Sequence, residues 1–243
     1  MINNFGWNSN KKILVLIILI IPLLLSLGFW QLDRAKEKEL LQEHYQFKMQ
    51  LQPRSIDEVS PSGQLSHTPV LVEGIFDNNR IILLDNRIIN GKVGYEVILP
   101  VVTSKGMTVL VNRGWVLGSR KRDELPKFEL INEKVILNGN IYVPLSKPVL
   151  LREDEWSDSW PLVVQWVDIE RIERALQTQV FPYIVRLKPE SAWALTTNWA
   201  PINTSSQKHL GYAFQWFLMA FALIIFWIYS SLEHKVTVEK DYE

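Results

Sequence analysis

The sequence predicts a membrane protein in which two transmembrane α-helices, one near each end, flank one mostly antiparallel β (α+β) domain outside the cytoplasm. Two uncharged apolar runs, residues 13–30 and 210–229, have about the length that a helix needs to cross roughly 30 Å of hydrocarbon. Between them, short β-branched runs alternate with turn residues, which is typical of an antiparallel sheet or a small barrel. One domain and two spans account for all 243 residues.

The first span is apolar from residue 13 to residue 30 apart from Ser26. A cleaved signal peptide is the alternative, because two lysines precede the run and small residues near its end could serve as a cleavage site. The bulky Phe29 and Trp30 favour an anchor at the membrane interface instead. We therefore expect a retained transmembrane helix.

The second span, residues 210–229, carries aromatic residues near both ends, where they suit the headgroup region. Basic residues flank the first span on both sides and do not decide the orientation. Long central domains are translocated with little regard to charge, so both termini are predicted in the cytoplasm. This gives cytoplasmic tails at 1–12 and 230–243 and a periplasmic domain at 31–209. The lack of an Arg-rich presequence favours a bacterial inner membrane.

The central domain is predicted to begin with a helix over residues 33–50, followed by a loop at 53–66. A further helix is predicted at 169–177, because Asp168 can cap it and apolar residues recur at helical spacing. The β-branched runs are predicted as strands over residues 70–76, 80–84, 94–103, 107–112, 135–142, 162–167 and 180–187.

Composition excludes several classes of function. Lysine plus arginine and aspartate plus glutamate each number 26, so no net charge attracts a phosphate backbone, and no nucleic-acid partner is expected. Cysteine is absent, which excludes thiolate catalysis and cysteine-bound metal sites. The four histidines show no helix-borne metal pair, and no nucleophile elbow, phosphate loop or dinucleotide fingerprint occurs. We therefore expect no enzyme.

An acidic stretch is formed by Glu153, Asp154 and Glu155 together with Asp158. These carboxylates could bind a cation or act as an acid and base pair. A solvated loop produces the same pattern more often, and we interpret the stretch in that way.

Two motifs are expected to meet at the outer membrane face, because antiparallel spans bring the end of the first and the start of the second together. One motif is Gly28-Phe29-Trp30-Gln31-Leu32-Asp33-Arg34, and the other is His209-Leu210-Gly211-Tyr212-Ala213-Phe214-Gln215-Trp216-Phe217. The two glycines, Gly28 and Gly211, would let the backbones approach closely.

The side chains of these motifs have the chemistry that a haem needs. His209, Tyr212 and Trp216 fall on one helical face, and Gln31 and Arg34 share a face of the other helix. Together they offer an imidazole for iron, aromatic walls and a guanidinium for the propionates. The alternative is a plain interfacial belt, since these residue types concentrate at membrane surfaces for physical reasons. Spacing alone favours that alternative.

At these residues the chain resembles the Surfeit locus protein 1 family of cytochrome c oxidase assembly factors. The family pattern G-x-W-Q-x-x-R is matched by Gly28, Trp30, Gln31 and Arg34. The bacterial pattern H-L-x-Y-A-x-Q-W-F is matched by His209, Leu210, Tyr212, Ala213, Gln215, Trp216 and Phe217. The two central motifs are matched by Asp85-Asn86-Arg87 with Gly94-Tyr95-Glu96-Val97 and Pro100, and by Val111-Asn112-Arg113-Gly114-Trp115. The resemblance covers about residues 25 to 225.

The resemblance implies a non-catalytic factor that binds haem a and assists its delivery to the oxidase catalytic subunit. It implies His209 as the iron ligand, Arg34 as a propionate partner, and Tyr212 and Trp216 as walls, with Gln31 and Trp30 beside them. The expected partners are that catalytic subunit, the haem a synthesis machinery and membrane lipid. Eukaryotic members tend to carry tryptophan where this chain has Glu37, which fits the bacterial branch.

Two other functions stay open. A scaffold could grip an oxidase subunit through the spans and the β domain without touching a cofactor. A membrane-tethered periplasmic enzyme is a third hypothesis, but no nucleophile, base and orienting group can be named together. Arg87 and Arg113 are interpreted as residues of the fold or of a docking surface.

Overall fold

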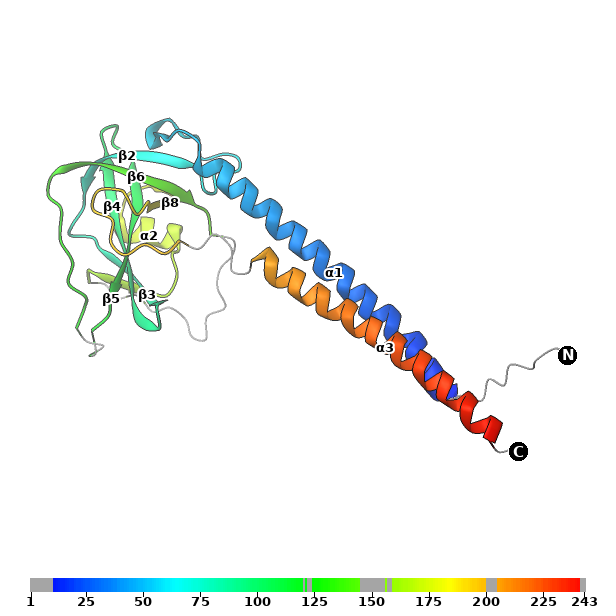
Figure 1. The fold of residues 1–243 in the computed structure, drawn as a ribbon. Coiled ribbons are helices and arrows are strands. Elements are labelled where there is room, and N and C mark those ends of the chain that lie inside the picture. Colours follow the sequence, from blue (N-terminus) through cyan, green and yellow to red (C-terminus); the bar gives the residue numbers. More distant parts are fainter. Residues whose placement is uncertain are drawn as a thin grey trace. The chain divides into compact units, whose positions relative to one another are not determined.

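A computed structural model describes residues 11–119, 121, 124–144, 156, 159–199 and 205–240 (Figure 1). The acidic residues Glu153, Asp154, Glu155 and Asp158 lie outside this described part. The chain divides into two compact units. The helical unit contains the residues up to His44 and from Pro201 onward, and the barrel unit is Tyr45–Ala200.

Two long helices, α1 (Lys11–Met49) and α3 (Ser206–Lys240), carry the two apolar runs. Each contains a segment that is long and apolar enough to cross a membrane, and few side chains of these segments are buried in the protein. Pro22 lies inside α1, as a membrane helix tolerates. The predicted helix after the first span is confirmed, because α1 continues without a break to Met49. The predicted architecture of two membrane helices flanking a β-rich domain is likewise confirmed.

The described part of the barrel unit forms one sheet of eight strands. The strands are β1 (Arg54–Ser55), β2 (Pro69–Phe76), β3 (Ile82–Ile89), β4 (Lys92–Thr103), β5 (Thr108–Leu117), β6 (Lys134–Tyr142), β7 (Leu162–Val164) and β8 (Val180–Leu187). Because β2 pairs with both β6 and β4, the strands β2, β6, β8, β5 and β4 close into a ring. The strands β3 and β7 extend the sheet beyond β4, and β1 pairs with β2.

Several strand predictions needed correction. The pairs β1–β2, β3–β7 and β5–β8 are parallel, which the local pattern of the chain does not reveal. Strand β3 runs on to Ile89 because Asn90 and Gly91, both with positive φ, make the tight turn of a hairpin with β4. The predicted loop at 53–66 contains β1 and a short 3-10 helix, Ile56–Glu58.

Alternation along the strands explains how the barrel is filled. Inward residues such as Val97 and Leu99 on β4, and Val109 and Val111 on β5, belong to one buried core. The residues between them, including Ile98 and Leu110, belong to a second core on the other face. Strands β4 and β5 are therefore buried on both sides, which explains why their sequences are almost continuously apolar.

The helix α2 (Ile169–Leu176) covers the second core with Ile172 and Leu176. The Asp168 side chain accepts a hydrogen bond of 3.2 Å from the Arg171 amide and so caps the first turn, as predicted. Gln177 ends the helix in the left-handed conformation.

Candidate functional site

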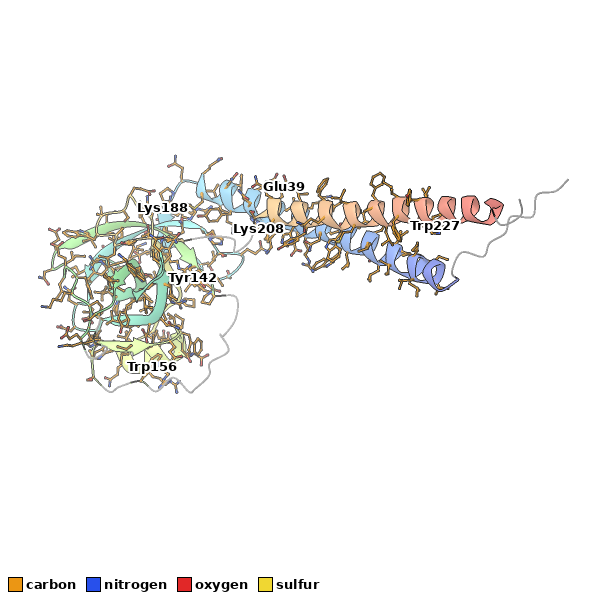
Figure 2. The ribbon with its side chains drawn as sticks, turned by 60° about the horizontal axis from the view of Figure 1, so that its bottom comes forward. Glu39, Tyr142, Trp156, Lys188, Lys208 and Trp227 are labelled. Carbon is orange, nitrogen blue, oxygen red and sulfur yellow. The ribbon has the colours of Figure 1, made fainter. Side chains whose placement is uncertain are left out.

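The two long helices pack against each other through one face of each helix (Figures 1 and 2). On α1 the buried positions Ile17, Leu24, Gly28 and Ala35 recur with a heptad-like spacing. A Cβ atom added to Gly28 would come within 2.6 Å of the Phe217 ring, so glycine makes this close contact possible. The rings of Phe29 and Phe217 also meet edge to face, with 5.3 Å between centroids.

The expectation for Gly211 was wrong. This residue is exposed, and a Cβ atom added there would meet nothing within 4 Å. The small residues that α3 buries are Ala213 and Ala220. Ala213 and Ala220 define the face of α3 that packs on α1, and the position of Gly211 in the sequence does not predict this face.

His209 and Gln31 are brought together across the two helices. His209 Nδ1 lies 2.7 Å from Gln31 Oε1. Because an amide oxygen only accepts hydrogen bonds, this geometry places a proton on Nδ1, and in the neutral imidazole the lone pair is then on Nε2. His209 Nε2 is buried and has no hydrogen-bond partner in the part of the chain that the structure describes.

Arg34 and Trp30 lie one turn apart on α1. The Arg34 guanidinium is 5.9 Å from the centre of the Trp30 ring, and it forms an ion pair with Glu37. Both side chains of that pair are about half exposed, so the contact adds little stability. The guanidinium can therefore exchange Glu37 for another anion at small cost.

Tyr212 and Trp216 differ in their surroundings. Trp216 is half-buried, as is His209, whereas Tyr212 is 53% exposed. Trp30 on α1 is exposed to a similar degree, at 50%. The helical unit thus offers one oriented imidazole and, two turns further along α3, a half-buried tryptophan. The tyrosine, the second tryptophan and the guanidinium of the two motifs are exposed.

These residues fit the demands of a haem iron site. An imidazole that ligates a metal must be neutral at the ligating nitrogen, and its other nitrogen normally donates a proton to an acceptor. The contact of His209 Nδ1 with Gln31 Oε1 meets the second condition and leaves Nε2 as the nitrogen that could face a metal. Nε2 is at present covered, so a ligand must displace the groups that cover it.

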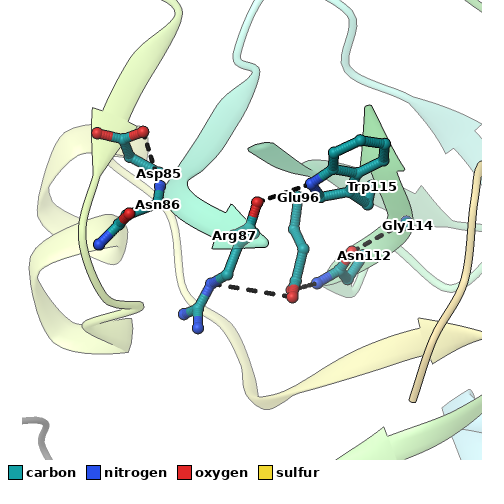
Figure 3. Close-up of polar contacts among 7 residues, drawn as sticks. All are labelled: Asp85, Asn86, Arg87, Glu96, Asn112, Gly114 and Trp115. Atoms are coloured by element: carbon teal, nitrogen blue, oxygen red, sulfur yellow. Dashed lines mark hydrogen bonds and ion pairs between the residues drawn. The ribbon is translucent and has the colours of Figure 1, made fainter. Parts of the chain in front are cut away.

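The two central motifs of the barrel unit lie at neighbouring bulges (Figure 3). The register between β3 and β4 shifts between Leu84 and Arg87, and that between β4 and β5 shifts at Val97 and Ile98. Glu96 on β4 connects the two bulges, because it accepts a 2.6 Å hydrogen bond from Asn112 and lies 3.8 Å from the Arg87 guanidinium.

Backbone groups complete this network. The Trp115 indole donates to the Arg87 carbonyl at 2.8 Å, and the Gly114 amide donates to Asn112 Oδ1 at 3.0 Å. Gly114 has a φ of 120°, and a Cβ atom there would come within 2.7 Å of the Thr196 carbonyl. The motif therefore requires glycine at this position.

Arg113 is 1% exposed and has a role in the fold. Its Nε donates to the Trp193 carbonyl at 3.0 Å and an Nη donates to the Glu129 carbonyl at 2.7 Å. The rings of Phe76 and Phe128 lie 5.7 and 5.9 Å from the guanidinium carbon. Burial lowers the pKa of Arg113 from its ordinary value, and the Glu129 carboxylate partly opposes this shift. Arg113 thus holds two loop segments against the barrel.

The sequence interpretation missed Arg186 and the aromatic residues around it. The Arg186 guanidinium carbon lies 3.4 Å from the centre of the Tyr142 ring and 4.6 Å from that of Trp199. A charged residue within the apolar β8 segment was the available signal. The presence of this arginine in the sequence does not predict which aromatic residues surround its side chain.

Comparison with known proteins gives a consistent result. The model of the SURF1 family matches residues 18–221. A SURF1-like protein of Rickettsia felis is 24% identical over 221 residues, which cover 88% of this chain and 94% of that protein. One from Rickettsia bellii is 28% identical over 218 residues, 88% of each chain. One from Dictyostelium discoideum is 29% identical over 142 residues, covering 52% of this chain and 53% of its own.

Proposed function

The chain belongs to the SURF1 family of cytochrome oxidase assembly factors, and from this premise we propose that it binds haem a and assists its insertion into the oxidase catalytic subunit. The haem a synthesis machinery is the proposed donor partner. The observation that supports this proposal most is the 2.7 Å contact between His209 Nδ1 and Gln31 Oε1, which leaves Nε2 as a lone pair suited to iron.

Each residue of the site has a proposed role. His209 Nε2 would be the axial ligand, and Gln31 would orient the imidazole from the opposite nitrogen. Trp216 and Tyr212 would lie against the macrocycle, which is the apolar contact that a haem needs. Arg34 would exchange Glu37 for a propionate, while the exposed Trp30 ring supports the guanidinium. Haem itself would supply the redox-active iron that the oxidase requires.

The proposal is tested by purifying the full chain in detergent from cells that make haem a. We expect the protein to show the absorption band of reduced haem a, because His209 Nε2 offers one imidazole nitrogen to the iron. Protein from cells lacking haem a synthesis is the control. A colourless preparation from cells that demonstrably contain haem a would contradict the proposal.

A scaffold without cofactor is the second candidate, and a surface of the barrel favours it. Ile75, Val102 and Ile136 lie on the neighbouring strands β2, β4 and β6 and are 46 to 64% exposed. Exposed apolar side chains on one sheet face are typical of a protein–protein contact. A colourless protein that still co-purifies with an oxidase subunit would support this second function.

Gln31→Leu is expected to weaken haem binding by about 10- to 100-fold, which is the usual effect of losing a partner that orients a metal-bound imidazole. Leucine preserves volume but cannot accept the Nδ1 proton. Haem titration of the detergent-solubilised variant measures the effect. Gln42→Leu, at an exposed position of the same helix, is the matched control. Equal haem affinity in Gln31→Leu and the wild type would show that Gln31 does not orient the haem ligand.

We also propose that the chain spans the bacterial inner membrane twice, with both termini in the cytoplasm and the barrel unit in the periplasm. The chain has no cysteine, so single cysteines report topology without background. We expect Ser60→Cys, exposed in the barrel unit, to react with an impermeant maleimide in intact spheroplasts. Ser9→Cys should react only after lysis. The opposite pattern would invert the proposed orientation.

A further inference from the structure

A row of polar side chains crosses the barrel on the face away from its inner core. It runs from Asn140 on β6 through Arg186 on β8 and Asn112 on β5 to Glu96 on β4 and Arg87 on β3, and we call it the polar strip. Asn140 pairs with Arg186 in the sheet register, and Arg186 pairs with Asn112. Their strand neighbours point into the inner core, so alternation places the strip on the opposite face.

The strip contains three buried polar atoms that lack a hydrogen-bond partner in the described part of the chain. They are Asn140 Oδ1, Arg186 Nε and Arg87 Nε, the last of which forms a 3.8 Å ion pair with Glu96 Oε1 that is too long for a hydrogen bond. Buried polar atoms are nearly always paired, so three in one row require an explanation. Two of them are donors on cations and the third is an acceptor. A ligand that satisfies them must carry both an anion and a donor group.

The surroundings of Arg186 restrict how a ligand could approach it. The rings of Tyr142 (labelled in Figure 2) and Trp199 lie against its guanidinium, at 3.4 and 4.6 Å. Trp199 is held in place because its indole donates a 2.6 Å hydrogen bond to the Leu187 carbonyl. The Tyr142 side chain also forms a hydrogen bond with the guanidinium, and Nε, at the edge of the group, is the atom left without a partner among the described residues. A guanidinium edge matches the two oxygens of a carboxylate.

The charges of the strip favour an anion with a single charge. Two guanidinium groups face one carboxylate, Glu96, which already binds Asn112 at 2.6 Å and lies 3.8 Å from Arg87. One positive charge is therefore left over. Burial lowers the pKa of Arg186. Glu96 and Tyr142 oppose this shift, whereas the positive charge of Arg87 adds to it. A second anion beside Arg186 would relieve the unbalanced charge.

We propose that the polar strip binds an acidic side chain of a partner protein, whose carboxylate meets the edges of Arg186 and Arg87 and whose backbone N–H donates to Asn140 Oδ1. The carboxylate satisfies the two cationic donors. The backbone amide satisfies the remaining acceptor, which a small carboxylate could not do. This site does not include the proposed haem ligand His209, so its test does not depend on haem binding.

Arginine side-chain NMR tests the proposal on the full chain in detergent, labelled with ¹⁵N-arginine. The probe is an acetylated and amidated Gly-Glu-Gly peptide, with its Gly-Gln-Gly counterpart and sodium acetate at equal ionic strength as comparisons. We expect a saturable shift of the Arg186 Nε–H signal with the glutamate peptide, none with the glutamine peptide, and weaker binding of acetate. The signal is assigned by its loss in Arg186→Lys.

Two variants separate binding from folding. Arg186→Lys keeps the positive charge but loses the planar pair of donors that matches a carboxylate. We expect the affinity for the glutamate peptide to fall at least roughly tenfold. Glu96→Gln raises the positive charge of the strip, and we expect tighter binding, which damage to the fold would not produce. Arg54→Lys, exposed on β1, is the unchanged control.

Three results would overturn the proposal. The first is the absence of a saturable shift with the glutamate peptide, and the second is weaker binding in Glu96→Gln. The third is equal affinity for acetate and the glutamate peptide, which would show that the site does not select a carboxylate carried by a protein.

Discussion

Replacement of His209 by alanine is expected to abolish the haem a absorption band of the purified protein almost completely. His209 Nε2 is the proposed axial ligand, and neither of the two motifs at this end of the long helices contains another histidine. The substitution also leaves Gln31 without its partner. The optical spectrum of the protein purified from cells that make haem a measures the effect.

His44→Ala is the matched control, because His44 is exposed on α1 and has no proposed role in the site. Its spectrum should equal that of the wild type. Added imidazole should restore part of the band in His209→Ala, since a free ligand can enter the space that the side chain leaves. An unchanged band in His209→Ala would show that iron is bound elsewhere.

Replacement of Arg113 by leucine is expected to lower the free energy of unfolding of the barrel unit by about 2–5 kcal/mol. Two part-buried hydrogen bonds from the guanidinium, to the carbonyls of Trp193 and Glu129, would be lost, and a hydrogen bond to a charged group contributes roughly 1.5–3 kcal/mol. Contacts of the guanidinium with Phe76 and Phe128 would be lost as well. Domains are stable by only about 5–15 kcal/mol, so the effect is large.

Denaturant titration of the full chain in detergent, followed by the circular dichroism of the strands, measures this change. Arg54→Leu, at an exposed position of β1, is the control and should change the stability by less than about 0.5 kcal/mol. An Arg113→Leu variant as stable as Arg54→Leu would contradict a role of Arg113 in holding the two loop segments. In that case the remaining interpretation is that Arg113 belongs to a surface that docks a partner protein.

The architecture could be predicted because its signals are local. The length and lack of charge of the apolar runs predict α1 and α3, and alternation predicts most of the strands. The parallel pair β5–β8 could not be predicted, because it joins segments that are far apart in the chain. The C-terminal end of β3 was missed for a different reason, since the Asn90-Gly91 turn was present in the sequence but was not used.

The candidate site was predictable in part. Antiparallel spans bring His209 and Gln31 to the same end of the helical unit, and the sequence places both in motifs. The hydrogen bond that sets the tautomer of His209 depends on side-chain geometry, which spacing does not determine. The polar strip was not predicted at all, because Arg186, Glu96 and Arg87 come from three different strands and only the register of the barrel places them in one row.

Resonance Raman spectroscopy of the reduced, haem-loaded full chain tests the ligand assignment most directly. If His209 Nε2 binds the iron, an iron–histidine stretching band should be present, should shift when the protein is labelled with ¹⁵N-histidine, and should be absent from His209→Ala. Gln31→Leu should move the same band to lower frequency, because the imidazole loses the acceptor that makes it a stronger ligand. An iron–histidine band that persists unchanged in His209→Ala would contradict the assignment.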